Sequence, residues 1–233
     1  MILSHRHKFV FFKQMKAAGS SLELALTPFC GPDDIMTGSP YDEEKTLGYY
    51  DRNNKLGYRP IWHQHSPPGE VLPVSFSAKD YFKFTSVRNP YDAVVSYFWW
   101  SFYAPDSTLK NHMLKPNRLD GSKELQSKFL TFLETYASFN TQGQQEKIID
   151  WFAGRYKLFY KVPLDFIIRY EDLDVDFSMA CGMIGLGPIN IPRLKSNIRK
   201  SNYNYSVYYT NRSYDIVTDR FSDLIDNFNY SFQ

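Results

Sequence analysis

Short apolar runs alternate along this chain with segments of helical periodicity. The run Phe9–Phe12 is continuous and too short for a helix, so it predicts a buried strand that begins at about His7. Tyr81–Val87 and Phe166–Arg169 predict two further strands of the same kind. Because a helical pattern follows each strand, we predict an α/β fold with a parallel sheet flanked by helices.

Residues that start or stop helices delimit these segments. Ser20–Leu26 predicts the first helix, which Pro28 ends. Asn89-Pro90 opens the second, with Asn at the N-cap and Pro at the first helical position. We predict a third helix that Asp172 caps and that runs to about Ile184, and a long amphipathic helix over Asn211–Tyr230.

Two stretches depart from this alternation. Residues 31–60 are rich in Gly, Asp, Asn, Pro and Tyr and predict mostly loop, whereas residues 104–145 predict helices and loops between core strands. We therefore expect one domain, 1–233, with insertions near 31–60 and 104–145. A short strand is predicted at residues 61–65.

Charge and composition narrow the function classes. The 27 basic and 25 acidic residues leave a formal charge of +2, which gives no indication of nucleic-acid binding. No apolar run approaches the roughly 20 residues that span a bilayer, and no signal-peptide pattern is present, so we expect a cytoplasmic protein without a transmembrane segment. Cys30 and Cys181 do not have metal-ligand spacing.

The connection between the first strand and the first helix is the first candidate site. Its residues, Lys16-Ala17-Ala18-Gly19-Ser20-Ser21, are small apart from the lysine. Such a strand–turn–helix connection presents backbone N–H groups and a positive helix end to a phosphate or sulfate. The lysine precedes the glycine, the reverse of the nucleoside triphosphatase order, and no downstream Asp completes a magnesium site. The alternative is an ordinary connection with a surface lysine.

A second candidate anion site follows the second strand. Arg88 comes at the carboxyl end of that strand, where open α/β sheets gather their ligands. Ser96 shares a helix stripe with Asp92 and is predicted to face the same crevice as Arg88. An arginine and a hydroxyl together predict a phosphate clamp. The alternative is a structural ion pair of Arg88 with Asp92 or Glu171.

With both elements present, the chain resembles the sulfotransferases that use 3'-phosphoadenosine-5'-phosphosulfate, and most closely their carbohydrate branch (heparan 2-O-like and bacterial). Lys16–Leu22 is similar to the family's loop Lys-Thr-Ala-Gly-Thr-Ser-Leu, and Phe84–Tyr97 to its 3'-phosphate element. Ile168–Leu173 matches a third family segment, and Tyr208–Tyr230 resembles the family's C-terminal end. Met15 departs from the proline that the family commonly has before the lysine.

The resemblance implies a P-loop-like sheet and the transfer of a sulfuryl group to a hydroxyl of a carbohydrate or glycoconjugate. Lys16 would neutralise charge on the leaving phosphate, and no metal would be required. The residues implied to bind the co-substrate are Lys16, Ala18, Gly19, Ser20, Ser21 and Leu22 for the 5'-phosphosulfate, and Arg88, Ser96, Arg199, Lys200 and Ser201 for the 3'-phosphate. For residues 199–201, the alternative to phosphate binding is a solvated basic turn.

The family's carbohydrate branch places a histidine base shortly before the Arg-Asn-Pro element. Here Trp62-His63-Gln64-His65 supplies two candidates, which share a face if the segment is extended. Position before the next turn favours His65 as the base, with His63 as the fallback and Glu171 less favoured. An ordinary histidine titrates near neutrality, which suits proton abstraction.

Other functions stay open at this point. One is a P-loop kinase for a nucleotide or small molecule, and another is a non-catalytic module that binds a nucleotide or polysaccharide. The acceptor would contact the two insertions and nearby aromatic residues, although core filling is the first expectation for each of Trp99, Trp100, Phe102 and Tyr103. No motif indicates the oligomeric state.

Overall fold

A computed structural model describes residues 1–37, 65–74, 78–103, 123–139, 145–194, 198–199 and 203–233. The chain forms two compact units. The first comprises Met1–Val87 and Leu158–Leu194, and the second Arg88–Lys157 and Lys195–Gln233, so the chain passes between them three times. The expectation of a single domain with two insertions stays a prediction.

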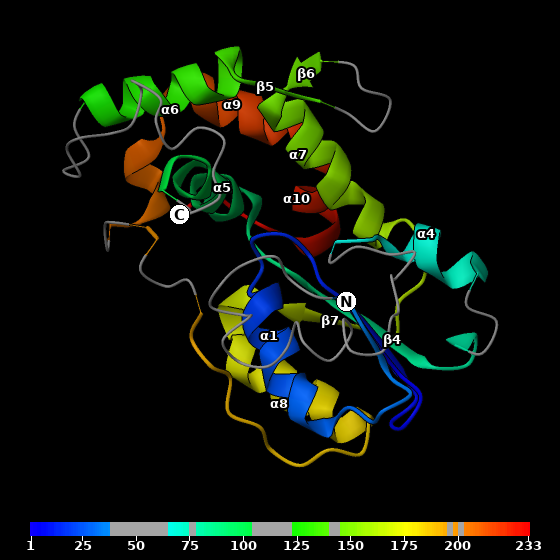
Figure 1. Cartoon of the computed structure of the whole chain (residues 1–233). Coiled ribbons are helices and arrows are strands. Elements are labelled where there is room, and N and C mark those ends of the chain that lie inside the picture. The colour runs from blue at the N-terminus through cyan, green and yellow to red at the C-terminus, as the bar shows by residue number, and fades with distance from the viewer. Residues whose placement is uncertain (38–64, 75–77, 104–122, 140–144, 195–197, 200–202) are drawn as a thin grey trace. The chain divides into compact units, whose positions relative to one another are not determined.

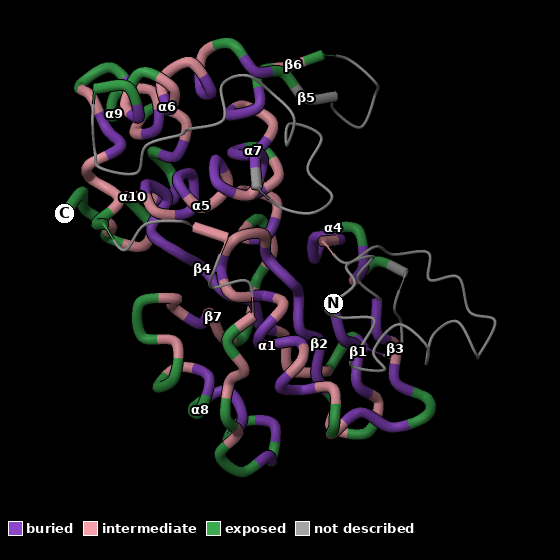
Figure 2. The backbone as a smooth tube through the Cα atoms, turned by 60° about the vertical axis from the view of Figure 1, so that its left-hand side comes forward, coloured by how far each residue is buried: buried purple, intermediate pink, exposed green. Residues whose placement is uncertain are grey.

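A five-stranded sheet organises the first unit. Its order is β3 (Ile35–Met36), β1 (Ile2–Ser4), β2 (Phe9–Phe12), β4 (Phe82–Val87) and β7 (Phe166–Arg169). Strands β2, β4 and β7 run parallel, but β1 is antiparallel to both of its neighbours, β2 and β3. Figure 2 shows β1 between these two strands. The α/β prediction is confirmed, and the three strands that the sequence predicted are parallel, but β1 and β3 make the sheet a mixed one. The β1–β2 connection is too short for a crossover, so these strands form a hairpin.

Helices cover both faces of this sheet. Helices α1 (Gly19–Leu26) and α8 (Leu173–Met183) flank one face, where Phe9 and Phe11 pack with them (Figure 1). Helix α4 (Pro68–Val71) and the 3₁₀ turn Leu158–Tyr160 contribute to the core of the other face, where Val10 and Phe12 lie. Because both faces are buried, β2 is a continuous apolar run in the sequence.

Helix α8 lies where it was predicted, with Asp172 at its N-cap position and Ile184 at its C-cap. A 3₁₀ turn, Tyr170–Asp172, precedes it, and the side chain of Asp172 makes no cap hydrogen bond within the described residues. The outer face of α8 carries an apolar stripe of Val175, Met179 and Met183, which are 65%, 50% and 53% exposed. These residues are four apart and therefore share one side of the helix.

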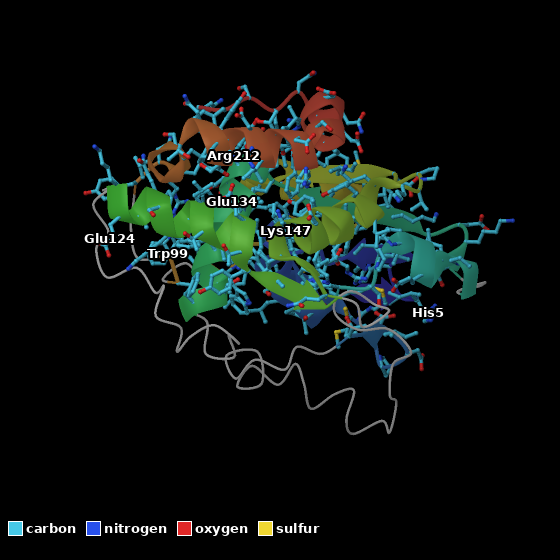
Figure 3. The ribbon with its side chains drawn as sticks, turned by 90° about the horizontal axis from the view of Figure 1, so that it is seen from above. His5, Trp99, Glu124, Glu134, Lys147 and Arg212 are labelled. Atoms are coloured by element: carbon cyan, nitrogen blue, oxygen red, sulfur yellow. The ribbon has the colours of Figure 1, made fainter. Side chains whose placement is uncertain are left out.

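The second unit is mainly helical. Helices α5 (Pro90–Tyr103) and α6 (Lys123–Thr135) share an aromatic core in which the Phe98 ring lies 5.3 Å from that of Phe132. Arg212 of α9 (Asn211–Arg220) and Glu134 of α6, both labelled in Figure 3, form a surface ion pair of 3.1 Å. The remaining elements are α7 (Ile148–Lys157), the strand pair β5 (Ala137–Phe139) and β6 (Gln145–Lys147), the 3₁₀ turn Tyr205–Tyr208, α9 (Asn211–Arg220) and α10 (Ser222–Phe228).

The prediction of one helix over Asn211–Tyr230 is wrong, because the helix breaks at Phe221. This residue has φ −114° and ψ 16° and separates α9 from α10. Its ring is completely buried and lies 5.9 Å from that of Tyr156 and 6.0 Å from that of Phe152. Packing of this ring against α7 accompanies the change of backbone direction. No helix in the described part of the chain is long and apolar enough to cross a membrane.

Candidate functional site

The connection from β2 to α1 has an unusual backbone. Lys16 and Ala18 have φ values of 59° and 60°, in the left-handed region that residues with a Cβ adopt rarely. Such conformations cost of order 1 kcal/mol each and are concentrated at functional sites. The turn is therefore held in shape by its surroundings, and α1 begins immediately after it.

Gly19 is the first residue of α1 and has no room for a side chain. A Cβ at this position would lie 2.7 Å from Cγ of Lys13 and 2.8 Å from the carbonyl oxygen of Gln14. The close approach brings the start of the helix against the residues that follow β2. The predicted small-residue turn is thus present, with the helix starting at Gly19 rather than at Ser20.

A buried ion pair supports this turn. Lys13 is 1% exposed, and its Nζ lies 2.7 Å from Oε2 of Glu23 on α1. Burial raises the pKa of Glu23, but the positive charges of Lys13 and of the α-amino group of Met1 outweigh burial and lower the pKa. Our sequence interpretation missed this pair, although a glutamate within the apolar segment Leu22–Leu26 is a signal that was available.

The structure places His65 against Lys13, which follows β2 and precedes this turn. Its Nδ1 lies 2.8 Å from the carbonyl oxygen of Lys13. A carbonyl only accepts hydrogen bonds, so Nδ1 carries the proton and the neutral ring has its lone pair on Nε2. This is the protonation pattern of a histidine that acts as a base through Nε2. His63 and most of the predicted strand at 61–65 lie outside the described residues, and His65 itself is in a turn.

Arg88 belongs to the second unit, at the start of α5. The backbone N–H of Tyr91 donates to Oδ1 of Asn89 at 3.1 Å, which confirms Asn89 as the predicted N-cap. Arg88 donates to Oδ2 of Asp92 from Nε at 2.9 Å and from Nη2 at 2.5 Å. The structural ion pair that the sequence offered as an alternative for Arg88 is therefore present.

Asp92 also binds a second arginine. Nη1 of Arg199 donates to Oδ1 of Asp92 at 2.8 Å, and Nη2 donates to the carbonyl oxygen of Tyr203 at 2.6 Å. Among the described residues, the buried Nε of Arg199 has no hydrogen-bond partner. Two guanidinium groups thus share one carboxylate.

The structure gives the burial or position of only some of the other residues that the sequence predicted for this site. Ser96 is half-buried on α5, one helical turn after Asp92. Lys200 and Ser201 lie outside the described residues. Glu171, the less favoured base, is exposed in the 3₁₀ turn after β7.

Several side chains that the sequence left open are structural. Trp99 and Phe102 are fully buried, and Nε1 of Trp99 donates to the hydroxyl of Tyr208 at 3.0 Å, so both fill the core of the second unit. Cys30 and Cys181 are buried in the core of the first unit, and the thiol of Cys30 donates to the carbonyl oxygen of Leu26. Burial raises the pKa of Cys181 to about 11.

Comparisons of the chain with protein-family models, with curated proteins and with solved structures found no match. The functional assignment therefore depends on the motifs of the chain and on the geometry of its two candidate anion sites.

Proposed function

We propose that this chain is a sulfotransferase with a P-loop-like fold. It would transfer a sulfuryl group from 3'-phosphoadenosine-5'-phosphosulfate to a hydroxyl of a carbohydrate or glycoconjugate. The observation that carries the proposal is the position of His65, whose Nδ1 lies 2.8 Å from the carbonyl oxygen of Lys13, three residues before Lys16. Sulfuryl transfer requires a base and an anion site close together, and we assign these roles to His65 and to the Lys16–Ser21 turn of the same unit.

In the proposed reaction, the acceptor oxygen bonds to sulfur as the bond between sulfur and the 5'-phosphate oxygen breaks. The hydroxyl proton passes to Nε2 of His65. Negative charge that develops on the 5'-phosphate is stabilised by Lys16 and by the N–H groups at the start of α1, with Ser20 and Ser21 alongside. The products are the sulfated acceptor and 3'-phosphoadenosine-5'-phosphate.

The residues around Asp92 suit a 3'-phosphate. Arg88 and Arg199 carry more positive charge than Asp92 neutralises, and Nε of Arg199 is a buried donor without a partner among the described residues. Charge-assisted hydrogen bonds contribute about 1.5–3 kcal/mol each. Ser96 would add a hydroxyl. The 3'-phosphate stays unchanged in the reaction, so this site would serve affinity and selection of the co-substrate.

Ligand-induced stabilisation tests the choice of co-substrate. We expect 3'-phosphoadenosine-5'-phosphate to raise the melting temperature much more than ATP, because ATP lacks the 3'-phosphate. At 100 times its dissociation constant, the ligand should add about 2.7 kcal/mol to the free energy of unfolding. Stabilisation by ATP alone would favour a kinase and overturn the proposal.

Substitution of the base tests the chemistry. We expect His65→Ala to lower transfer of radiolabelled sulfate to polysaccharides or lipid-linked glycans by about 10²-fold or more. Binding of 3'-phosphoadenosine-5'-phosphate should change little. His5→Ala is a matched control, because His5 contacts the hydroxyl of Tyr81 in the same unit. Full turnover by His65→Ala would exclude His65 as the base, and binding without turnover by the unsubstituted chain on any acceptor would favour a non-catalytic module.

A further inference from the structure

We propose that Asp92 is a positioning residue that holds Arg88 and Arg199 as a pair for the 3'-phosphate; this inference rests on the function proposed above. Each carboxylate oxygen serves one arginine. Oδ2 accepts from Arg88 at 2.9 and 2.5 Å, and Oδ1 accepts from Arg199 at 2.8 Å. The spacing of the two guanidinium groups is therefore set by a single carboxylate.

The two arginines need such a partner because they are like charges brought together from distant parts of the chain. Arg199 lies 107 positions from Asp92, whereas Arg88 is one helical turn before it. Two guanidinium groups drawn to one point repel each other in the absence of an anion. Asp92 contacts both of them in the structure, so the pair exists before the phosphate binds.

The backbone that carries Asp92 is itself held firmly. Asn89 caps the start of α5, and its Nδ2 donates to the carbonyl oxygen of Ser231 at 3.0 Å. The hydroxyl of Tyr209 donates to the carbonyl oxygen of Tyr91 at 2.8 Å. These contacts fix the residues that precede Asp92, and a carboxylate in the first turn of a helix is favoured by the helix dipole.

Arg199 is held on several sides by described residues. Tyr203 accepts from Nη2, Asp92 accepts from Nη1, and the guanidinium carbon lies 5.5 Å from the centre of the Tyr208 ring. Within the described residues only Nε lacks a partner. Because Asp92 holds Nη1, the Nε–H is a donor that an incoming phosphate oxygen would take.

The positioning role and simple electrostatics predict opposite effects of removing the Asp92 charge on phosphate affinity. Removal of a negative charge beside a phosphate would ordinarily strengthen phosphate binding. If Asp92 positions the arginines, Asp92→Asn instead weakens binding of 3'-phosphoadenosine-5'-phosphate by about tenfold or more, the effect of one lost charge-assisted bond.

The test is a calorimetric titration of 3'-phosphoadenosine-5'-phosphate and of 5'-AMP into the full chain and its variants. 5'-AMP lacks the 3'-phosphate, so its affinity should be the same for Asp92→Asn and for the unsubstituted chain. Asp150→Asn is the charge-matched control, because Asp150 pairs with Arg220 in the same unit and should leave both affinities unchanged. Unchanged or tighter binding of the 3'-phosphorylated ligand by Asp92→Asn would overturn the inference, as would an equal loss for both ligands.

A double-mutant cycle keeps the inference testable if Asp92→Asn is also less stable. Arg199→Lys retains the charge but loses the fork that binds carboxylate and phosphate together. We expect the losses of affinity for Asp92→Asn and Arg199→Lys to be less than additive, because both break one arrangement. Additive losses of affinity would contradict the inference that Asp92 positions Arg199. Failure of the unsubstituted chain to prefer the 3'-phosphorylated ligand over 5'-AMP would instead contradict the proposed function.

Discussion

Lys13 and Glu23 form an ion pair that is buried beneath the candidate phosphate turn. Desolvation makes such pairs costly to form, so they contribute less to stability than their short distance suggests. Removal of one partner, in contrast, leaves an unpaired buried charge. The Lys13 carbonyl also accepts the hydrogen bond from His65, so the pair lies under both parts of the candidate reaction centre.

We predict that Glu23→Gln lowers the free energy of unfolding by about 3–5 kcal/mol, because the buried ammonium groups of Lys13 and Met1 then lose the carboxylate that both contact. The pKa of Glu23 is lowered below its ordinary value of 4.5, so its contribution to stability is complete above that pH and is lost as pH falls through the folded-state pKa. Urea unfolding at a series of pH values between about 6 and 3 measures both effects.

Glu70→Gln is the control, because Glu70 is an exposed carboxylate on α4 of the same unit. It should change the free energy of unfolding by less than about 0.5 kcal/mol. If Glu23→Gln kept the same loss of stability in acid as the unsubstituted chain, the ion pair would not be its source.

At the scale of elements, the start of α1 depends on the absence of a side chain at Gly19. We predict that Gly19→Ala lowers the free energy of unfolding by about 1–3 kcal/mol and weakens binding of 3'-phosphoadenosine-5'-phosphate. The added Cβ would lie 2.8 Å from the Gln14 carbonyl oxygen, which cannot move without moving the turn. Thermal unfolding and ligand titration measure the two effects.

Gly154→Ala is the matched substitution for this experiment. Gly154 lies within α7, and a Cβ there has no described atom within 4 Å. Alanine should therefore be neutral or stabilising at this position, by up to about 1 kcal/mol. Equal effects of the two substitutions would show that the close approach at Gly19 is unimportant.

Elements with strong local signals could be predicted from the sequence alone. The apolar runs of β2, β4 and β7 and the Asn89 cap were predicted close to their observed positions. Strands β1 and β3 were not predicted, because runs of two or three residues acquire their structure by pairing with neighbours. The break at Phe221 was likewise missed, since it accompanies packing against another helix.

The candidate site was predictable in part. Sequence reasoning offered phosphate binding and an ion pair with Asp92 as alternatives for Arg88. The structure shows one carboxylate shared by Arg88 and Arg199, an arrangement that sequence spacing cannot reveal across 107 positions. The contact of His65 with the Lys13 carbonyl was hidden for the same reason, because it joins residues 52 positions apart.

At the scale of the whole molecule, each compact unit is built from segments that are far apart in the sequence. The sheet of the first unit receives β7 from the second of its two segments, and α8 follows β7. Completion of this core therefore depends on residues near position 170. Non-local pairing of this kind usually forms late in folding.

We predict that a fragment of residues 1–157 does not unfold cooperatively. It lacks β7 and α8, so Phe84 and the apolar side of α1 lose neighbours that include Ile168 and Phe177. Urea titration followed by near-ultraviolet circular dichroism should give a broad, shallow transition for the fragment and a sharp one for the full chain. A sharp transition for the fragment would show that the core of β1–β4 is sufficient.

The apolar stripe on α8 has a chemical consequence. Met179 and Met183 are about half exposed, whereas Met1 and Met36 are 0% and 1% exposed. Mild peroxide will therefore convert the two α8 thioethers to sulfoxides well before it reaches the buried ones. Oxidation would make this face of the helix polar and chiral, while Phe177 and Cys181 on the opposite side keep their packing. The sulfoxide content of Met179 and Met183 would then report the exposure of the protein to oxidants.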